Sequence, residues 1–223
     1  MFFPDSIQKL FPKYQFEVKN GNVSIIEKDT QAKLKEIQFS HDEFWSIDTN
    51  MIKDFSSFFE KANSPDFFHK DCDGIFMFEY KGQKYILVVE LKSSFDTSKI
   101  YYARTQIISS YIKLNILLNM IPEYEKDEYV FKGVIASLTP NDEQLNGISK
   151  TMLLPNDDLK KKQSSFALNL YRNKEKTITK GLCQEIAQYE LSDKCMFEEL
   201  AFNYIGVDAG NTSHPLTIAE FLS

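Results

Sequence analysis

The fold is decided by residues 71–94, which read Asp71-Cys72-Asp73-Gly74-Ile75-Phe76-Met77-Phe78-Glu79-Tyr80, Lys81-Gly82-Gln83-Lys84 and Tyr85-Ile86-Leu87-Val88-Val89-Glu90-Leu91-Lys92-Ser93-Ser94. Both flanks are rich in aromatic and β-branched residues, and Gly82 lies between them. This pattern predicts two antiparallel strands joined by a tight turn. The hairpin is unusual because charged residues interrupt strands that are otherwise apolar.

The register of this hairpin decides whether its charges share a face. A type II′ turn has Gly at its first central position, which Gly82-Gln83 satisfies. Asp73 then lies opposite Lys92, and Glu90, two residues earlier on the same strand, shares their face. A slip by one residue would send Asp73 to the other side of the sheet. The predicted register therefore brings Asp73, Glu90 and Lys92 together.

Two carboxylates at such close range repel each other unless a cation or a shared proton neutralises them. Mg²⁺ binds one or two carboxylates and takes water and phosphate oxygens as further ligands. Lys92 beside the ion can orient or deprotonate a polarised water and offset charge on a phosphorus centre. These residues suit metal-assisted hydrolysis of a phosphodiester. The alternative is an edge hairpin in which Asp73 and Lys92 form an ion pair worth a modest fraction of a kcal/mol.

The motif of Asp73-Gly74-Ile75, followed by Glu90-Leu91-Lys92 at the end of an apolar strand, resembles the core of the PD-(D/E)xK nuclease superfamily. The resemblance implies a restriction-endonuclease-like fold and a phosphodiesterase that uses Mg²⁺ or Mn²⁺. It also implies that Asp73 and Glu90 bind the metal, that the main-chain carbonyl of Leu91 is a further ligand, and that Lys92 is the catalytic amine.

The first acidic position departs from the family pattern. The literal Pro-Asp pair is Pro65-Asp66, which lies further upstream, and Asp71 is a second competitor. Asp73 is preferred because it alone falls in register with Glu90 and Lys92.

Helices are predicted on both sides of the hairpin. Asp48 or Thr49 can cap a helix that ends near Ala62, and apolar residues recur along it at helical spacing. In the resembling family this helix often supplies another acidic residue, so Glu60 is a candidate metal ligand. The alternative for Glu60 is an ordinary solvated side chain.

A second helix is predicted from Ser98, as its N-cap, to Met120. One face is apolar, and Tyr102, Gln106, Ser109, Ser110 and Lys113 share the opposite flank. In the resembling family this helix often carries a Gln, Lys or Tyr that assists the site. Gln106 is therefore predicted to position the attacking water.

The predicted fold class is α/β, with a restriction-endonuclease-like mixed β-sheet flanked by helices in a single domain of residues 1–223. Its parts are an N-terminal β-hairpin over about 14–27 with Asn20-Gly21 at the turn, a segment over 32–46 that is ambiguous between helix and strand, a core over about 48–140 with a strand over 129–139, and a helical C-terminal part over about 156–223 with helices near 180–191 and 194–205.

The composition limits the partners. A net charge of −6 excludes a uniformly basic nucleic-acid binder, so nucleic acid must meet a local patch. The basic candidates are Lys160, Lys161, Lys162, Arg172, Lys174, Lys176 and Lys180, for which a plain solvated surface is the alternative. Three widely spaced cysteines indicate neither disulfides nor zinc, which favours a cytoplasmic protein. Neither export nor membrane insertion is expected.

These observations predict a Mg²⁺-dependent endonuclease that acts on DNA in restriction, repair or defence against phage. A homodimer is expected if both strands are cut, because each chain offers one site. RNA and branched DNA stay open as substrates, as does a requirement for a protein partner or activator. The alternative from another class is a non-catalytic, nuclease-like module that binds nucleic acid or a partner protein.

Overall fold

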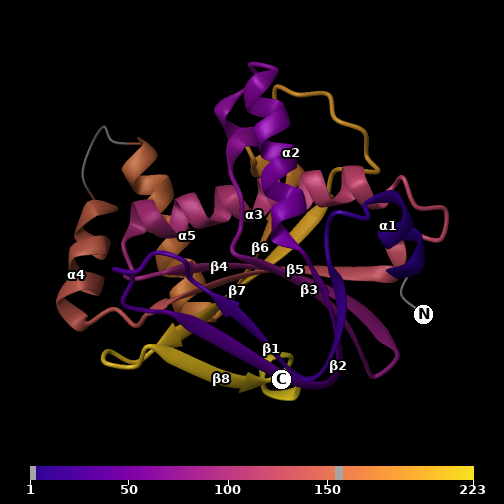
Figure 1. Ribbon diagram of the computed structural model, residues 1–223. Helices are drawn as coiled ribbons and strands as arrows, with labels where there is room; N and C mark the ends of the chain where they lie inside the picture. Colours follow the sequence, from indigo (N-terminus) through magenta and orange to yellow (C-terminus); the bar gives the residue numbers. More distant parts are fainter. Residues whose placement is uncertain (1–3, 154–157) are drawn as a thin grey trace.

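The computed structural model describes residues 4–153 and 158–223, which form a mixed eight-stranded sheet flanked by helices (Figure 1). The strand order is β1-β2-β3-β4-β5-β7-β6, and β8 pairs with β2. The elements are α1 (Pro4–Leu10), β1 (Phe16–Ile26), β2 (Glu36–Ile47), α2 (Thr49–Lys61), η1 (Asp66–His69), β3 (Gly74–Tyr80), β4 (Gln83–Lys92), α3 (Thr97–Leu118), η2 (Lys126–Glu128), β5 (Tyr129–Leu138), α4 (Asp142–Thr151), α5 (Asp158–Asn173), β6 (Glu175–Thr179), η3 (Lys180–Leu182), β7 (Glu199–Val207), β8 (Ser213–Thr217) and α6 (Ile218–Phe221). The predicted α/β class is confirmed at this level.

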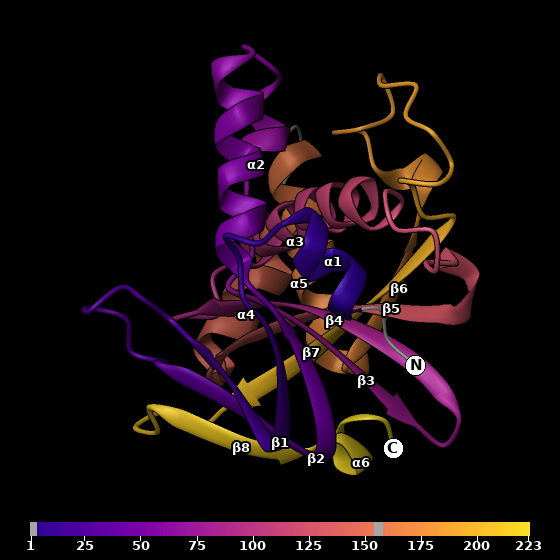
Figure 2. The same cartoon turned by 45° about the vertical axis from the view of Figure 1, so that its right-hand side comes forward.

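The sheet separates two hydrophobic cores. Helices α2, α3 and α5 cover one face, whereas the lower parts of β1 and β2, together with β8 and α6, cover the other (Figure 2). Alternate residues of β4 divide between the cores, since Ile86 and Val88 pack on the helical side and Leu87 and Val89 on the opposite side. A strand buried on both faces reads as a continuous apolar run, as β4 does before Glu90.

Strand β2 explains how the sheet curls over this second core. It pairs with β1 along its length. Its other edge is shared, because Trp45–Ile47 pair with β3 and Glu36–Ser40 pair in parallel with β8. The ambiguous segment over 32–46 is therefore largely strand.

The turn of the central hairpin differs from the predicted one. Tyr80 pairs with Gln83, and the two residues between them have positive φ, 51° at Lys81 and 78° at Gly82. This is a type I′ turn rather than the predicted type II′ turn at Gly82-Gln83. Ile75 consequently lies opposite Val88 instead of Glu90. The shift moves each partner by two residues, which changes the opposed pairs but leaves every side chain on its predicted face.

The prediction of an N-terminal hairpin within residues 14–27 is wrong. Asn20 and Gly21 lie inside the continuous strand β1, where the pairing with β2 shifts, and Gly21 has φ of 88°. Asp42 of β2 is the extra residue at this β-bulge. Gly21 has the positive φ that a type I′ turn requires, but here it adopts it inside a strand opposite the bulge, so the dipeptide alone does not distinguish the two.

The C-terminal part is less helical than predicted. Residues 156 and 157 lie outside the described residues, and α5 follows them. The helix predicted near 180–191 is wrong, because only the three-residue 3-10 helix η3 forms there and turns follow it. Most of the helix predicted over 194–205 is instead strand β7. Burial in β7 alternates between adjacent residues, and its partners are β5 and β6, so tertiary pairing prevailed over a helical reading of its apolar residues.

Helices α2 and α3 match their predictions closely. The side chain of Asp48 caps α2 by accepting from the backbone N–H of Asn50. Asp96 rather than Ser98 caps α3, accepting from the N–H groups of Ser98 and Lys99. Helix α3 connects β4 to the parallel strand β5 and crosses the sheet in Figure 1. Among the described helices, none has the length and apolar character needed to cross a bilayer.

The type I′ turn generates a stability prediction. Lys81→Asn is expected to stabilise the chain by about 0.5–1 kcal/mol, because Asn tolerates the left-handed conformation better than Lys. The melting temperature should rise by roughly 1–4 °C in thermal unfolding. Lys81→Gln is the matched control, since it removes the same charge without favouring positive φ. Equal melting temperatures for the two variants would contradict the turn assignment.

Candidate active site

Asp73, Glu90 and Lys92 meet where the central hairpin opens toward α3. The backbone N–H of Asp73 donates to the carbonyl of Val89 at 3.0 Å, which extends the hairpin by one residue beyond β3. Glu90 and Lys92 continue the alternation that places Ile86 and Val88 on the helical side of β4. The structure thus brings these three predicted residues together in a register two residues away from the predicted one.

Glu90 is the buried member of the group, with 2% of its surface exposed. Its Oε1 accepts from the ammonium group of Lys92. Its Oε2 is buried and has no hydrogen-bond partner in the described part of the chain. Burial raises the pKa of Glu90 well above its ordinary value, and the charge of Asp73 adds to the effect. A buried carboxylate oxygen without a partner is costly, and a bound cation would remove that cost.

Asp73 is held by the strand that carries Glu90. Its Oδ2 accepts from the backbone N–H of Leu91 at 2.8 Å. Burial raises the pKa of Asp73, and the Leu91 hydrogen bond opposes this shift. The charge of Lys53 on α2 also favours the ionised carboxylate, whereas that of Glu27 disfavours it. Two partly desolvated carboxylates therefore lie next to each other at the hairpin end.

Lys92 is fixed from two sides. Its ammonium group donates to Glu90 and, at 2.8 Å, to Oε1 of Gln106 on α3. Gln106 Nε2 in turn donates to the main-chain carbonyl of Asp71 at 2.7 Å. The ring centroid of Tyr102 lies 5.6 Å from the Lys92 ammonium. Gln106, predicted to position the attacking water, thus contacts the lysine directly.

Glu60 is not brought to the group. Helix α2 begins at Thr49, which lines a hollow of about 310 Å³ together with Asp73. Glu60 lies eleven residues further along the helix, about 16 Å away from Thr49 along its axis. Helix α2 rises away from the sheet, and Glu60 is exposed near its far end (Figure 2). Glu60 is therefore a solvated glutamate in this structure.

Glu27 is the acidic residue that the sequence analysis missed. It follows β1, and its charge raises the pKa of both Asp73 and Glu90. Its Oε1 accepts from the backbone N–H of Asp29 at 3.0 Å. The available signal was an acidic residue directly after an apolar strand end. The hairpin predicted over about 14–27 gave no reason to place Glu27 near Asp73 and Glu90.

An open cavity of about 580 Å³ lies beside the group. Leu91 and Lys92 of β4 line it together with Glu27, the residue that follows β1. The remaining wall comes mostly from the start of α3, with Gln163 of α5. Leu91, whose carbonyl the resemblance implies as a metal ligand, is thus at the cavity. A substrate of nucleotide size can approach Lys92 from this side.

Comparison with family models, with curated proteins and with solved structures gives no match. Within residues 4–153 and 158–223, His, Cys, Asp and Glu side chains form no group of three or more that could hold a metal ion. Asp73 and Glu90 are a pair of carboxylates. A pair suits Mg²⁺, which usually keeps several waters and binds through one or two carboxylates and substrate phosphates.

The raised pKa of Glu90 predicts that replacing this residue with neutral Gln stabilises the chain, and that the gain depends on pH. The pKa of Glu90 is higher in the folded chain than its ordinary value of 4.5 in the unfolded chain. Wild type therefore loses stability as the pH rises from 4.5 through the folded-state pKa, because Glu90 must then ionise in its buried position. In EDTA, Glu90→Gln should therefore melt higher than wild type, by an amount that grows from pH 5 to pH 8.

Thermal unfolding at several pH values measures this difference. Each kcal/mol corresponds to roughly 2–4 °C for a chain of this size. Glu79→Gln on the exposed part of the same hairpin is the control and should show no such trend. The burial argument would be refuted if the melting temperature of Glu90→Gln, taken relative to wild type at the same pH, were lower at pH 8 than at pH 5.

Proposed function

We propose that this chain is a metal-dependent phosphodiesterase, an endonuclease that cleaves DNA. The observation that carries the proposal is the buried, unpartnered Oε2 of Glu90 beside the carboxylate of Asp73 and the ammonium of Lys92. A hairpin kept only for structure has no need of two desolvated carboxylates at one end. The two acids and one amine match the groups that metal-assisted phosphodiester hydrolysis requires.

The donor set fits Mg²⁺ or Mn²⁺. Both ions take oxygen ligands. Asp73, directly before β3, and Glu90 of β4 supply carboxylate oxygens. The carbonyl of Leu91, at the cavity wall, is a further candidate. An ion held there would polarise a water molecule and a phosphoryl oxygen of the substrate. Its positive charge would also offset the repulsion that raises the pKa of Glu90.

Lys92 is the residue that acts on the reacting atoms in this proposal. Lys92 lines the cavity, and its ammonium group could hold the attacking water or donate to a non-bridging phosphate oxygen. Glu90 and Gln106 fix the direction of the ammonium group, so little reorganisation is needed when the substrate arrives. Gln106 is a positioning residue, because its own hydrogen bonds go to Lys92 and to the Asp71 carbonyl.

The order of elements supports the restriction-endonuclease-like assignment that the motif implies. Helix α2 precedes the hairpin of β3 and β4, and α3 then leads to β5, which lies parallel to β4. The acidic and basic residues of the motif lie at the end of β4 that faces the start of α3. Fold-level likeness supports the chemistry only together with the residues of the site.

DNA is the proposed substrate because one predicted basic segment adjoins the cavity. Lys160, Lys161 and Lys162 lie at the start of α5, and the next residue, Gln163, lines the cavity that contains Lys92. Helix α5 also packs against α3. A phosphate backbone bound along α5 would therefore enter the cavity next to the catalytic lysine, despite the acidic net charge.

Cleavage assays on linear duplex, supercoiled and single-stranded DNA and on RNA test the function directly. With Mg²⁺, wild type is expected to cut DNA, while Asp73→Asn and Glu90→Gln should lose essentially all activity. Lys92→Ala should lose about 10²–10⁴-fold in rate. EDTA should abolish cleavage. Undiminished cleavage by Lys92→Ala would remove the role given to that lysine.

The same assay separates the nuclease from a binding module. A chain that binds Mg²⁺ and DNA but cuts no substrate, even with added cell extract as a source of an activator, would favour the non-catalytic alternative. Cleavage of both strands at one position would require two copies, which sedimentation of the DNA complex would detect. Preference for RNA or branched DNA in these assays would keep the chemistry and replace the proposed substrate.

The two outlying glutamates give a further comparison. Glu27→Gln should weaken Mg²⁺ binding by up to about tenfold, because the charge of Glu27 acts on both carboxylates of the site. Glu60→Gln should bind Mg²⁺ like wild type, because Glu60 lies at the far end of α2. Calorimetric titration measures both affinities. A loss for Glu60→Gln that equals or exceeds the loss for Glu27→Gln would reverse the assignment.

A further inference from the structure

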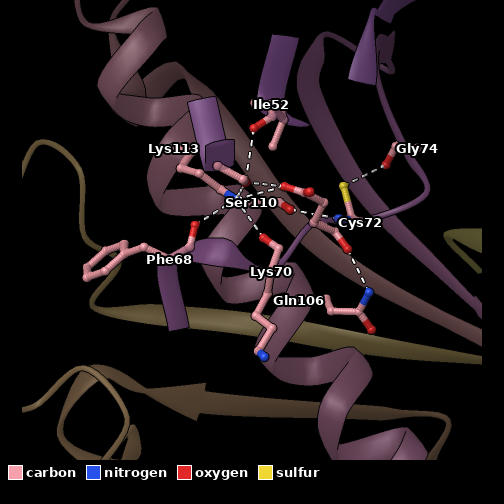
Figure 3. Close-up of polar contacts among 10 residues, drawn as sticks. Ile52, Phe68, Lys70, Cys72, Gly74, Gln106, Ser110 and Lys113 are labelled. Atoms are coloured by element: carbon pink, nitrogen blue, oxygen red, sulfur yellow. Dashed lines mark hydrogen bonds and ion pairs between the residues drawn. The ribbon is translucent and has the colours of Figure 1, made fainter. Parts of the chain in front are cut away.

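The loop before Asp73 is held by a stripe of polar residues on α3. Gln106, Ser110 and Lys113 are spaced by four and three residues, so they lie on one side of the helix. All three contact the segment between η1 and β3. Figure 3 shows these side chains converging on the chain that leads to Gly74. An amphipathic helix usually turns such a stripe toward solvent, whereas Ser110 and Lys113 are buried.

Lys113 is the centre of this arrangement, and its side chain has no exposed surface. Its ammonium donates to the carbonyl of Lys70 at 2.6 Å and to the carboxylate of Asp71 at 2.9 Å. It also donates to the hydroxyl of Ser56 on α2, and the carbonyl of Phe68 lies 3.4 Å away (Figure 3). The three short contacts use all three ammonium protons. The loop before Asp73 is thus bonded to one buried ammonium group, that of Lys113.

Two further contacts fix the residues on either side of the Asp71–Cys72 peptide bond. The backbone N–H of Cys72 donates to Oγ of Ser110 at 2.9 Å. Gln106 Nε2 donates to the carbonyl of Asp71 at 2.7 Å. Both groups of this peptide are therefore bonded to α3, one residue before Asp73. The same Gln106 side chain holds Lys92, so the stripe connects the loop to the amine as well.

We infer that Lys113, with Ser110 and Gln106, is a positioning residue for the divalent-cation site. By fixing the loop that precedes Asp73, it holds the Asp73 carboxylate next to that of Glu90. This inference rests on the proposed function, since it assigns the stripe to the metal site of that function. Asp73 lies outside β3, and its own backbone bond is to Val89. Its side chain is held from β4 by the Leu91 N–H, and its position against Glu90 depends also on a second constraint, on the residues that precede it. Lys113 supplies that constraint from the helix.

The test is calorimetric titration of the metal-free chain with Mg²⁺. Lys113→Met keeps the length of the side chain and removes its three hydrogen bonds. Its Mg²⁺ affinity should fall about 10–100-fold, as for residues that orient metal ligands. Leu200→Ala, at a buried position of β7, is the control for lost stability. At a temperature where both variants are folded, Leu200→Ala should keep the wild-type affinity, because lost stability alone does not move a ligand.

Cleavage gives a second readout. The rate of Lys113→Met should recover as Mg²⁺ is raised, whereas that of Leu200→Ala should follow the wild-type Mg²⁺ dependence. Ser110→Ala, which frees only the Cys72 N–H, decides the matter if Lys113→Met does not fold, and it should weaken Mg²⁺ binding several-fold. Wild-type affinity in a folded Lys113→Met, or in Ser110→Ala where Lys113→Met is unfolded, would overturn the positioning role alone. A wild-type chain that binds no Mg²⁺ would overturn the metal site and this inference together.

Discussion

The rest of the site depends on the burial of two like charges at the open end of one hairpin. Glu90 ends an apolar run that is packed on both faces, so water cannot solvate its carboxylate as it would at a surface. Asp73 enters from the neighbouring strand and raises the cost of ionising Glu90. Lys92 offsets part of that cost with one hydrogen bond, which leaves Oε2 of Glu90 unmatched. Protonation of Glu90 or a bound cation would neutralise this pair.

Helix α3 carries the constraints that keep these charges in place. Its apolar face packs into the core on the helical side of the sheet. Its polar stripe holds the loop before Asp73, and one member of the stripe also holds Lys92. Burying Lys113 costs solvation, which lowers its pKa, and the carboxylate of Asp71 opposes that shift. A buried ion pair contributes little net stability, but its geometry is strictly defined. Such a pair is therefore better suited to setting a position than to stabilising the fold.

The sequence predicted the elements near the hairpin better than those far from it, for physical reasons. The turn type was wrong, yet Asp73, Glu90 and Lys92 kept a common face because a two-residue shift preserves the alternation of a strand. Asn20-Gly21 misled because Gly21 adopts positive φ inside a continuous strand, opposite a bulge, and not in a turn. Glu27 reaches the site through the pairing of β1 with β2 and the curl of the sheet. Contacts of that kind depend on tertiary structure, which no local pattern of residues records.

The local charges also explain how an acidic chain can meet a nucleic acid. Around the site, the carboxylates of Asp73, Glu90 and Glu27 outweigh Lys92, so an approaching phosphodiester is repelled. A divalent cation held by Asp73 and Glu90 would neutralise this net negative charge. The basic start of α5 then lies on the same side as the cavity, and its lysines and the cation attract the same phosphate backbone. For the proposed function, the cation is therefore needed before the phosphate can bind, and the buried unpartnered oxygen of Glu90 is what makes that order possible.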